Sequence, residues 1–156
     1  MDDVIILDTD SARLREVAKL IDRFLKEKLK IELHPKKTIL QRVDKGVDLL
    51  GYIVCPEYTL SRKRVVGKLK MKLEGFNSEL VRTMDMDEIE RVVKYAQAVV
   101  NSYWGHFKHA DCGGLKRKIY QKHFGRLRDY LEPSDAAGGH MILRDGISPE
   151  DAPAER

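Results

Sequence analysis

Two adjacent carboxylates, Asp2 and Asp3, stand directly before an apolar run at residues 4–7. Burying neighbouring negative charges costs free energy unless a cation neutralises them. Mg²⁺ prefers carboxylate oxygens, and a pair of magnesium ions can catalyse phosphoryl transfer by stabilising the entering and the leaving oxygen. Because charged residues usually lie exposed, the dipeptide alone is better explained as two solvated side chains. The metal interpretation therefore depends on the rest of the chain.

Two basic clusters, residues 62–72 and 115–128, contain no acidic residue. The first holds Arg62, Lys63, Arg64, Lys68, Lys70 and Lys72, and the second holds Lys116, Arg117, Lys118, Lys122, Arg126 and Arg128. Protein surfaces ordinarily mix both signs of charge. A run of one sign favours contact with a phosphate backbone, which gives salt-dependent affinity without sequence choice. The alternative is a solvated helix face.

The first part of the chain has the pattern of strands around one helix. Apolar runs and alternation predict strands at residues 3–8, 31–33, 38–43, 47–54 and 58–65. Apolar spacing of three and four predicts a helix over residues 14–29, with Asp10 or Ser11 as its N-cap. A buried strand that opens at residue 3 has no partner before it, so we expect missing upstream sequence.

The second part of the chain is helical in its pattern. Apolar residues recur every three or four positions over residues 66–80, 89–107 and 115–131, and Asp85 or Asp87 can cap the second of these helices. From Pro133 onward the sequence combines glycine and proline with little periodicity. We expect this tail to be disordered or loosely attached.

Composition narrows the class of protein. The formal net charge of +4 divides into +7 over residues 1–133 and −3 over residues 134–156, and a basic body favours a polyanionic partner. No run approaches the roughly 18 apolar residues of a membrane span, and two early aspartates do not suit a secretory signal. We therefore expect a cytoplasmic protein without a membrane partner. Cys55 and Cys112 are expected to be reduced thiols, because their spacing suits neither zinc nor a disulfide framework.

Four segments resemble the motifs of bacterial reverse transcriptases, in that family's order. Met1 to Leu7 resembles the second half of the Tyr-x-Asp-Asp motif, and Leu33 to Thr38 resembles the L-x-P-x-K-T segment. Gly46 to Val54 resembles the G-x-x-F-L-G-Y segment, with Leu49 where the family usually has Phe. Asn101 to Ala110 resembles a segment of the thumb. Together these segments extend the resemblance over about residues 1–131.

The resemblance implies an α+β fold and a fragment of an RNA-directed DNA polymerase. Residues 1–65 would be the C-terminal part of the palm, with antiparallel strands and one helix, residues 66–132 a three-helix thumb, and residues 133–156 the tail. The parent would be a retroelement enzyme of the group II intron, retron, diversity-generating or another bacterial type, and the sequence does not decide among them. Its partners would be an RNA template, a DNA primer and deoxynucleoside triphosphates. The fingers and a third palm carboxylate are not in this chain, so we expect it to be inactive alone.

The resemblance also assigns roles to individual residues. Asp2 and Asp3 would be catalytic and would ligate Mg²⁺, the third ligand coming from outside this chain. Lys37 would be the cation near the leaving pyrophosphate, although Lys36 competes for that role and a surface lysine is the alternative. The residues implied to contact nucleic acid are Leu50, Gly51, Tyr52, Arg62, Lys63, Arg64, Lys68, Lys72, His106, Lys108, Lys116 and Arg117.

Three of those residues carry an additional prediction. Leu50, Gly51 and Tyr52 would form the hairpin that grips the primer end. A glycine within a strand lets another backbone approach closely. Tyr52 could offer its ring to a sugar and its hydroxyl to a phosphate, or it could be a core tyrosine with a satisfied hydroxyl. We expect His106 and Lys108 to face phosphate or solvent.

Two other functions remain open on the sequence. The chain could be a non-catalytic basic module that binds nucleic acid, or an unrelated helical interaction domain. The first alternative predicts duplex binding that does not change when Asp2 and Asp3 become asparagine. The second predicts no salt-dependent binding to a primer–template. A metal site at His106, His109 and Cys112 is disfavoured, because no second pair completes four ligands.

Overall fold

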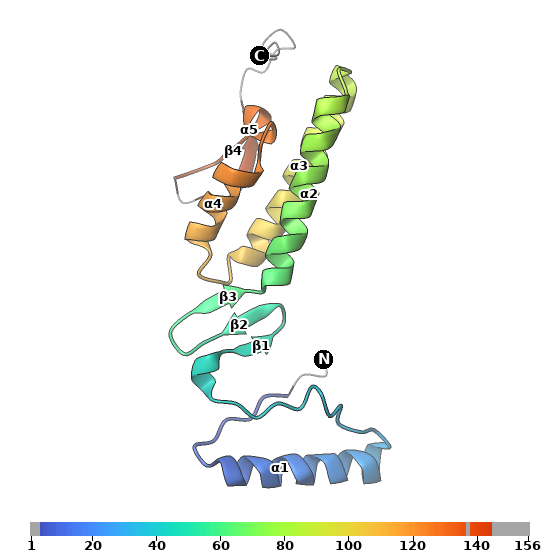
Figure 1. Ribbon diagram of the computed structural model, residues 1–156, viewed down its shortest axis with the longest axis vertical. Helices are drawn as coiled ribbons and strands as arrows, with labels where there is room; N and C mark the ends of the chain where they lie inside the picture. Colours follow the sequence, from blue (N-terminus) through green and yellow to red (C-terminus); the bar gives the residue numbers. More distant parts are fainter. Residues whose placement is uncertain (1–3, 137, 145–156) are drawn as a thin grey trace.

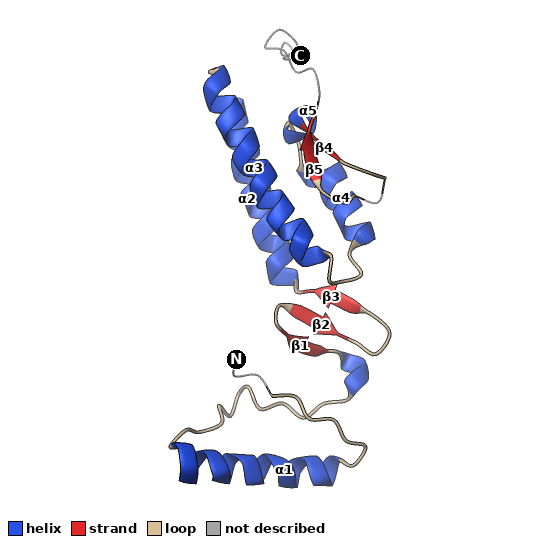
Figure 2. Cartoon of the chain, turned by 180° about the vertical axis from the view of Figure 1, so that it is seen from behind, coloured by secondary structure: helices blue, strands red, loops and turns tan. Residues whose placement is uncertain are grey.

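The computed structural model describes residues 4–136 and 138–144. The molecule is elongated, with helix α1 at one end, a small sheet in the middle and the remaining helices at the other end (Figure 1). We call residues 4–46 the N-terminal unit, residues 47–61 the sheet, and residues 63–144 the helical unit. Seen from behind, the sheet lies between α1 and the ends of α2 and α3 (Figure 2). The predicted α+β class is confirmed.

The predicted first helix forms and ends at the predicted residue. Helix α1 spans Ser11–Phe24 and continues as a π-helical segment, Leu25–Leu29. Asp10 is the N-cap, because its carboxylate accepts the Ala12 N–H at 2.8 Å. Lys30 takes a positive φ of 56° and ends the helix.

Three predicted strands are wrong in the residues that the structure describes. Residues 4–10, 30–34 and 38–42 form no strand. A strand exists only when its N–H and C=O groups pair with a neighbour, and the described residues supply no neighbouring strand here. Val4 to Leu7 consequently leave between 44% and 76% of their surfaces exposed. Their apolar pattern suits a buried strand, and the described residues supply no partner for it.

The single strand predicted at residues 47–54 is wrong, because the chain reverses in its middle, and the hairpin that the resemblance implied at residues 50–52 is present. Strand β1 spans Val47–Leu49 and β2 spans Tyr52–Val54, and they pair antiparallel with Leu49 opposite Tyr52. The two-residue turn is Leu50–Gly51, where φ is positive at both positions (49° and 94°), as a type I′ hairpin loop requires. Strand β3, Thr59–Ser61, then pairs with β2, so the sheet order is β1-β2-β3.

The helical unit contains the predicted helices with shifted bounds. Helix α2 spans Lys63–Arg82, three residues earlier than the predicted boundary, and α3 spans Met86–Phe107 with Asp85 as its N-cap. The predicted third helix is broken into α4, Gly113–His123, and α5, Leu127–Tyr130. The break lies at Gly125, where φ is +51° and the Asn77 side chain occupies the space that a Cβ would need.

The buried apolar residues of the described chain all lie between Leu69 and Met141. Trp104 is at their centre, with its ring 5.8 Å from that of Phe107 and 6.2 Å from that of Phe124. The set comprises Leu69, Leu73, Phe76, Leu80, Val93, Ala96, Val100, Trp104, Phe107, Cys112, Ile119, Phe124, Leu127, Leu131 and Met141. The helical unit therefore has a core of its own.

The prediction of a disordered tail is wrong for residues 133–136 and 138–144. Strand β4, Leu131–Pro133, pairs with β5, Met141–Leu143, and Met141 is buried. The Asn101 amide holds Met141 from both sides, because its Oδ1 accepts the Met141 N–H at 2.7 Å and its Nδ2 donates to the Met141 carbonyl at 3.0 Å. The rest of the predicted tail, residues 145–156, lies outside the described residues.

Candidate nucleic-acid interface

The tip of the β1–β2 hairpin is held in an unusual backbone conformation. Leu50 has a φ of 49° and leaves 58% of its surface exposed. A left-handed conformation costs a residue with a Cβ about 1–2 kcal/mol. Backbone strain of this kind persists where surrounding contacts hold the residue in place, and strained residues are common at binding and active sites. The contacts beneath the tip supply that surrounding structure.

Tyr52 and His106 join the hairpin to the end of α3. Their rings stack with centroids 4.3 Å apart and an interplanar angle of 11°. The Tyr52 hydroxyl donates to the His106 carbonyl oxygen at 2.9 Å and lies 3.0 Å from His106 Nδ1. The hydroxyl has one hydrogen, so when it donates to the carbonyl, Nδ1 is the protonated ring nitrogen and donates to the tyrosine oxygen. The Tyr52 hydroxyl is satisfied within the chain, but Tyr52 is half-buried and lies outside the buried core, so its contact with a primer stays a prediction.

The His106 ring is not directed at solvent, so that part of the prediction is wrong, and a contact of His106 with phosphate stays a prediction. Its Nε2 is buried and has no hydrogen-bond partner within the described residues. The ring lies under the hairpin turn, where a Cβ added at Gly51 would approach His106 Cε1 to 3.1 Å. Gly51 is thus required for two reasons, its φ of +94° and the close approach of this ring. The close neighbour is a side chain and not the second backbone that the sequence suggested.

Two further connections fix the sheet to the helical unit. The Arg62 N–H donates to the Gly51 carbonyl at 3.1 Å, and the Arg62 guanidinium pairs with the Asp48 carboxylate. At the far edge, Thr59 and Asp111 exchange two bonds: the Asp111 N–H donates to the Thr59 carbonyl at 2.8 Å, and Asp111 Oδ2 accepts the Thr59 N–H at 2.9 Å. The hairpin tip therefore has a fixed position beside the first turn of α2.

Replacing Tyr52 with phenylalanine should loosen this attachment without unfolding the helical unit. The variant keeps the ring stack and loses the hydroxyl bond to His106, whose net contribution is about 0.5–1.5 kcal/mol. We expect the Arg62 amide, which bonds to Gly51, to exchange its hydrogen several-fold to about tenfold faster, as followed by NMR. The matched control is Tyr95→Phe on α3, where the side chain is 60% exposed. Equal exchange rates in both variants would contradict the role assigned to Tyr52.

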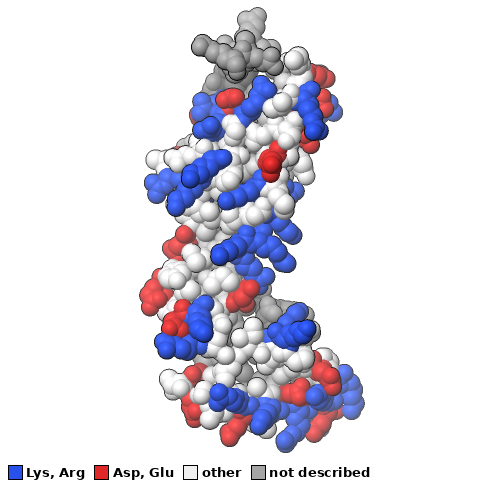
Figure 3. Space-filling view, viewed as in Figure 1, with Lys and Arg blue, Asp and Glu red and all other residues white. Residues whose placement is uncertain are grey.

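The basic side chains of α2 divide between two sides of the helix. Arg64, Lys68 and Lys72 are spaced by four residues, so they form one exposed row, which we call the α2 stripe. Lys63 and Lys70 are seven residues apart and lie on the opposite flank, facing α4. Lys and Arg side chains gather over the lower part of α2 and over α4 in the space-filling view (Figure 3).

The other predicted contact residues differ in how free their charges are. Lys108 and Arg117 are exposed. Arg62 is paired with Asp48 and supports the hairpin. Lys116 is half-buried, with its ammonium 5.9 Å from the centre of the Trp104 ring and 3.4 Å from the Gly138 carbonyl oxygen that it bonds. The Lys116 ammonium therefore interacts with the Trp104 ring and stabilises the packing of the helical unit.

His123, near the end of α4, lies close to two lysine charges. Burial lowers the pKa of His123 below its usual 6.5, and the charges of Lys70 and Lys122 lower it further. Glu74 acts in the opposite direction as the weakest of these influences.

Sequence reasoning missed the roles of Asp48 and Asp111, which anchor the sheet. Asp48 could have been noticed as the sole charge in residues 47–54.

The predicted catalytic residues are not brought together in what the structure describes. Asp2 and Asp3 lie outside the described residues. Lys37 is exposed in a turn after Pro35, where its N–H donates to the His34 carbonyl at 2.9 Å. Among residues 4–136 and 138–144, no three His, Cys, Asp or Glu side chains form a group that could hold a metal ion. The described residues therefore do not complete the predicted Mg²⁺ site.

Comparison with known proteins adds no family. No protein-family model matches the chain, and no curated protein matches it either. In the part of the chain that the structure describes, none of the helices has the length and apolar character needed to cross a membrane.

Proposed function

We propose that this chain is the C-terminal palm and thumb of an RNA-directed DNA polymerase, a retroelement nucleotidyltransferase, and that it holds the primer–template duplex. The observation that carries the proposal is the bond between the Arg62 N–H and the Gly51 carbonyl. It sets a strained, exposed hairpin tip directly beside a helix whose first three turns carry unopposed positive charge. A backbone turn next to a row of cations suits a strand end and the phosphates that lead to it.

Each part of this interface has a distinct role in the proposal. The α2 stripe binds backbone phosphates through exposed ammonium and guanidinium groups, so it holds a duplex of any sequence. The Leu50–Gly51 turn contacts the primer end, and the Tyr52–His106 pair keeps that turn in place. Asp2 and Asp3, with a carboxylate from outside this chain, hold Mg²⁺, which would stabilise charge on the transferring phosphoryl group. Lys37 is the candidate cation for the leaving pyrophosphate.

Exposed apolar side chains in residues 4–60 support the proposal that this part of the chain packs against further structure. Of the 21 large apolar side chains that are exposed among the described residues, fifteen lie within residues 4–60. None of the buried apolar side chains belongs to that region. A unit that buries none of its apolar side chains gains little stability from them. The remainder of the palm and the fingers is the partner that the proposal assigns to this surface.

The chain alone should bind a primer–template and fail to extend it. We expect binding that weakens steeply between 50 and 200 mM salt, measured by fluorescence anisotropy with an RNA template and a labelled DNA primer. In the same tubes, Mg²⁺ and deoxynucleotides should produce no longer primer. Mg²⁺-dependent extension that Asp2→Asn abolishes would contradict the incompleteness of the chain. Absence of binding at 50 mM salt would contradict the proposal itself.

The second candidate function is that of a non-catalytic nucleic-acid-binding module. It is favoured by the exposed cations of the α2 stripe, which suit phosphate binding, while no three His, Cys, Asp or Glu side chains among the described residues form a group that could hold a metal ion. Under the polymerase proposal, the chain combined with the palm and fingers portion that it lacks binds primer–template more tightly when Mg²⁺ and a matched deoxynucleotide are added, and the double variant Asp2→Asn/Asp3→Asn removes that increment. Under the binding-module proposal, neither the ions nor the substitutions change the affinity.

A further inference from the structure

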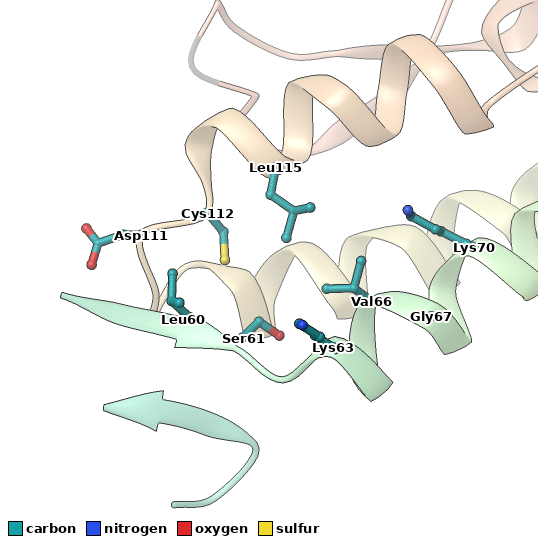
Figure 4. A pocket seen from close by; sticks show the side chains of 9 residues that line it. All are labelled: Leu60, Ser61, Lys63, Val66, Gly67, Lys70, Asp111, Cys112 and Leu115. Carbon is teal, nitrogen blue, oxygen red and sulfur yellow. The ribbon is translucent and has the colours of Figure 1, made fainter. Parts of the chain in front are cut away.

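A pocket of about 430 Å³ lies between the start of α2 and the start of α4. It is on the flank of α2 opposite the α2 stripe, so the proposed duplex interface does not use it. Strand β3 closes one end through Leu60 and Ser61 (Figure 4). The pocket lies within the usual size range for small-molecule sites.

Two cations and an unpartnered hydroxyl define the polar side of the pocket. Lys63 and Lys70 extend from the α2 wall (Figure 4). Ser61 Oγ is buried and has no hydrogen-bond partner among the described residues. A buried hydroxyl without a partner costs free energy, which an accepting oxygen would recover. These three groups together suit a phosphate, which accepts several hydrogen bonds and carries negative charge.

The one acid at the pocket does not neutralise the lysines. The Asp111 carboxylate accepts the Thr59 N–H at 2.9 Å and is directed away from Lys63 and Lys70 (Figure 4). Both helices also begin at the pocket without a side-chain cap, α2 after Arg62 and α4 after Cys112. Their free N–H groups and dipoles add positive potential at the same place.

Apolar side chains line both sides of the pocket. Val66 lies on α2 between the two lysines and faces Leu115 on α4 across the pocket, and Leu60 and Cys112 complete the apolar lining. Gly67 widens the space, because no atom lies within 4 Å of where its Cβ would be. A flat, weakly polar ring fits between aliphatic side chains such as Val66 and Leu115. The ligand should therefore join a phosphate to a flat ring.

The geometry points to a nucleoside phosphate site, with the phosphate between Lys63, Lys70 and Ser61 and the base between Val66 and Leu115. The nucleotide can be free, or it can be one residue of a single strand. This site goes beyond the duplex interface and uses none of the three α2 stripe residues. It can therefore be tested separately from the proposed function.

The test titrates the full chain with adenosine 5′-monophosphate, adenosine and inorganic phosphate, followed by NMR and calorimetry. We expect the monophosphate to bind at least tenfold more tightly than either part alone and to shift the amide signals of Ser61, Gly67 and Leu115. Lys70→Gln should weaken that binding about tenfold or more, and Ser61→Ala should weaken it several-fold. Lys94→Gln, an exposed lysine on α3, is the control and should have no effect.

A second arm separates the two sources of the nucleotide. A deoxyadenylate tetranucleotide whose binding depends on Lys70, while the monophosphate does not bind, would support a nucleotide supplied by a strand. Equal affinity for phosphate and for the monophosphate would overturn the proposal that Val66 and Leu115 bind the base. Binding of both nucleotides that is unchanged in Lys70→Gln and Ser61→Ala would overturn the site. Substituting the α2 stripe should reduce duplex binding and leave the monophosphate titration unchanged.

Discussion

Alanine substitution of Arg64, Lys68 and Lys72 together should weaken primer–template binding by a factor on the order of 10² at 0.1 M salt. The reason is the loss of up to three phosphate contacts, each of which releases condensed counterions from the duplex. The plot of log affinity against log salt concentration should become shallower by up to about 2.7, or about 0.9 for each contact. Anisotropy titrations at several salt concentrations measure both quantities.

Helix α1 offers a matched control for that variant. Arg15, Lys19 and Arg23 have the same spacing of four residues and are equally exposed, so their replacement removes the same charge from a different helix. If only net charge steers the duplex, both triple variants should lose the same affinity. Equal losses would contradict the α2 stripe as the binding surface. A loss confined to the α2 variant would support it.

Leu73→Ala should lower the free energy of unfolding of the helical unit by about 2–5 kcal/mol. Leu73 is fully buried between α2 and its neighbours, so the truncation leaves a cavity in the core. Met71→Ala is the matched control two residues earlier, because Met71 is 65% exposed on the same helix. That change should alter the free energy of unfolding by less than about 0.5 kcal/mol. Urea unfolding followed by circular dichroism measures both variants.

The result for Leu73 also tests where the cooperative core lies. If residues 69–141 form the stabilised unit, the unfolding midpoint should fall while the slope against urea stays constant. A similar small effect in both variants would contradict the core described for the helical unit.

The helices could be predicted from sequence because their signals are local. Leu69, Leu73, Phe76 and Leu80 recur at helical spacing within one segment, and a helix satisfies its backbone hydrogen bonds internally. The strands were predicted less well, because the hydrogen bonds of a strand form with a partner that lies elsewhere in the sequence. Residues 4–7 have a strand's composition and no strand partner in the described chain. The residue pattern alone did not predict the turn at Leu50–Gly51, because leucine seldom adopts a positive φ, and only the resemblance implied a hairpin there.

The candidate site was predictable in its charges and not in its contacts. The row formed by Arg64, Lys68 and Lys72 follows from spacing alone. The stack of Tyr52 on His106 joins residues 54 positions apart, and no local sequence pattern predicts it. Lys116 belonged to the same basic run as Arg117, and only its position over Trp104 shows that it serves packing. The second strand of the C-terminal hairpin was missed for the same reason, because Asn101 holds Met141 across 40 residues.

Lysine footprinting of the full chain with and without a primer–template tests the central claim most directly. Acylation rates at individual lysines, read by mass spectrometry, report which surface the duplex covers. We predict that Lys68 and Lys72 become protected, while the exposed Lys19 and Lys94 keep their rates. Protection at Lys19 or Lys94 with Lys68 and Lys72 still reactive, under conditions where the duplex is bound, would contradict the interface proposed for α2.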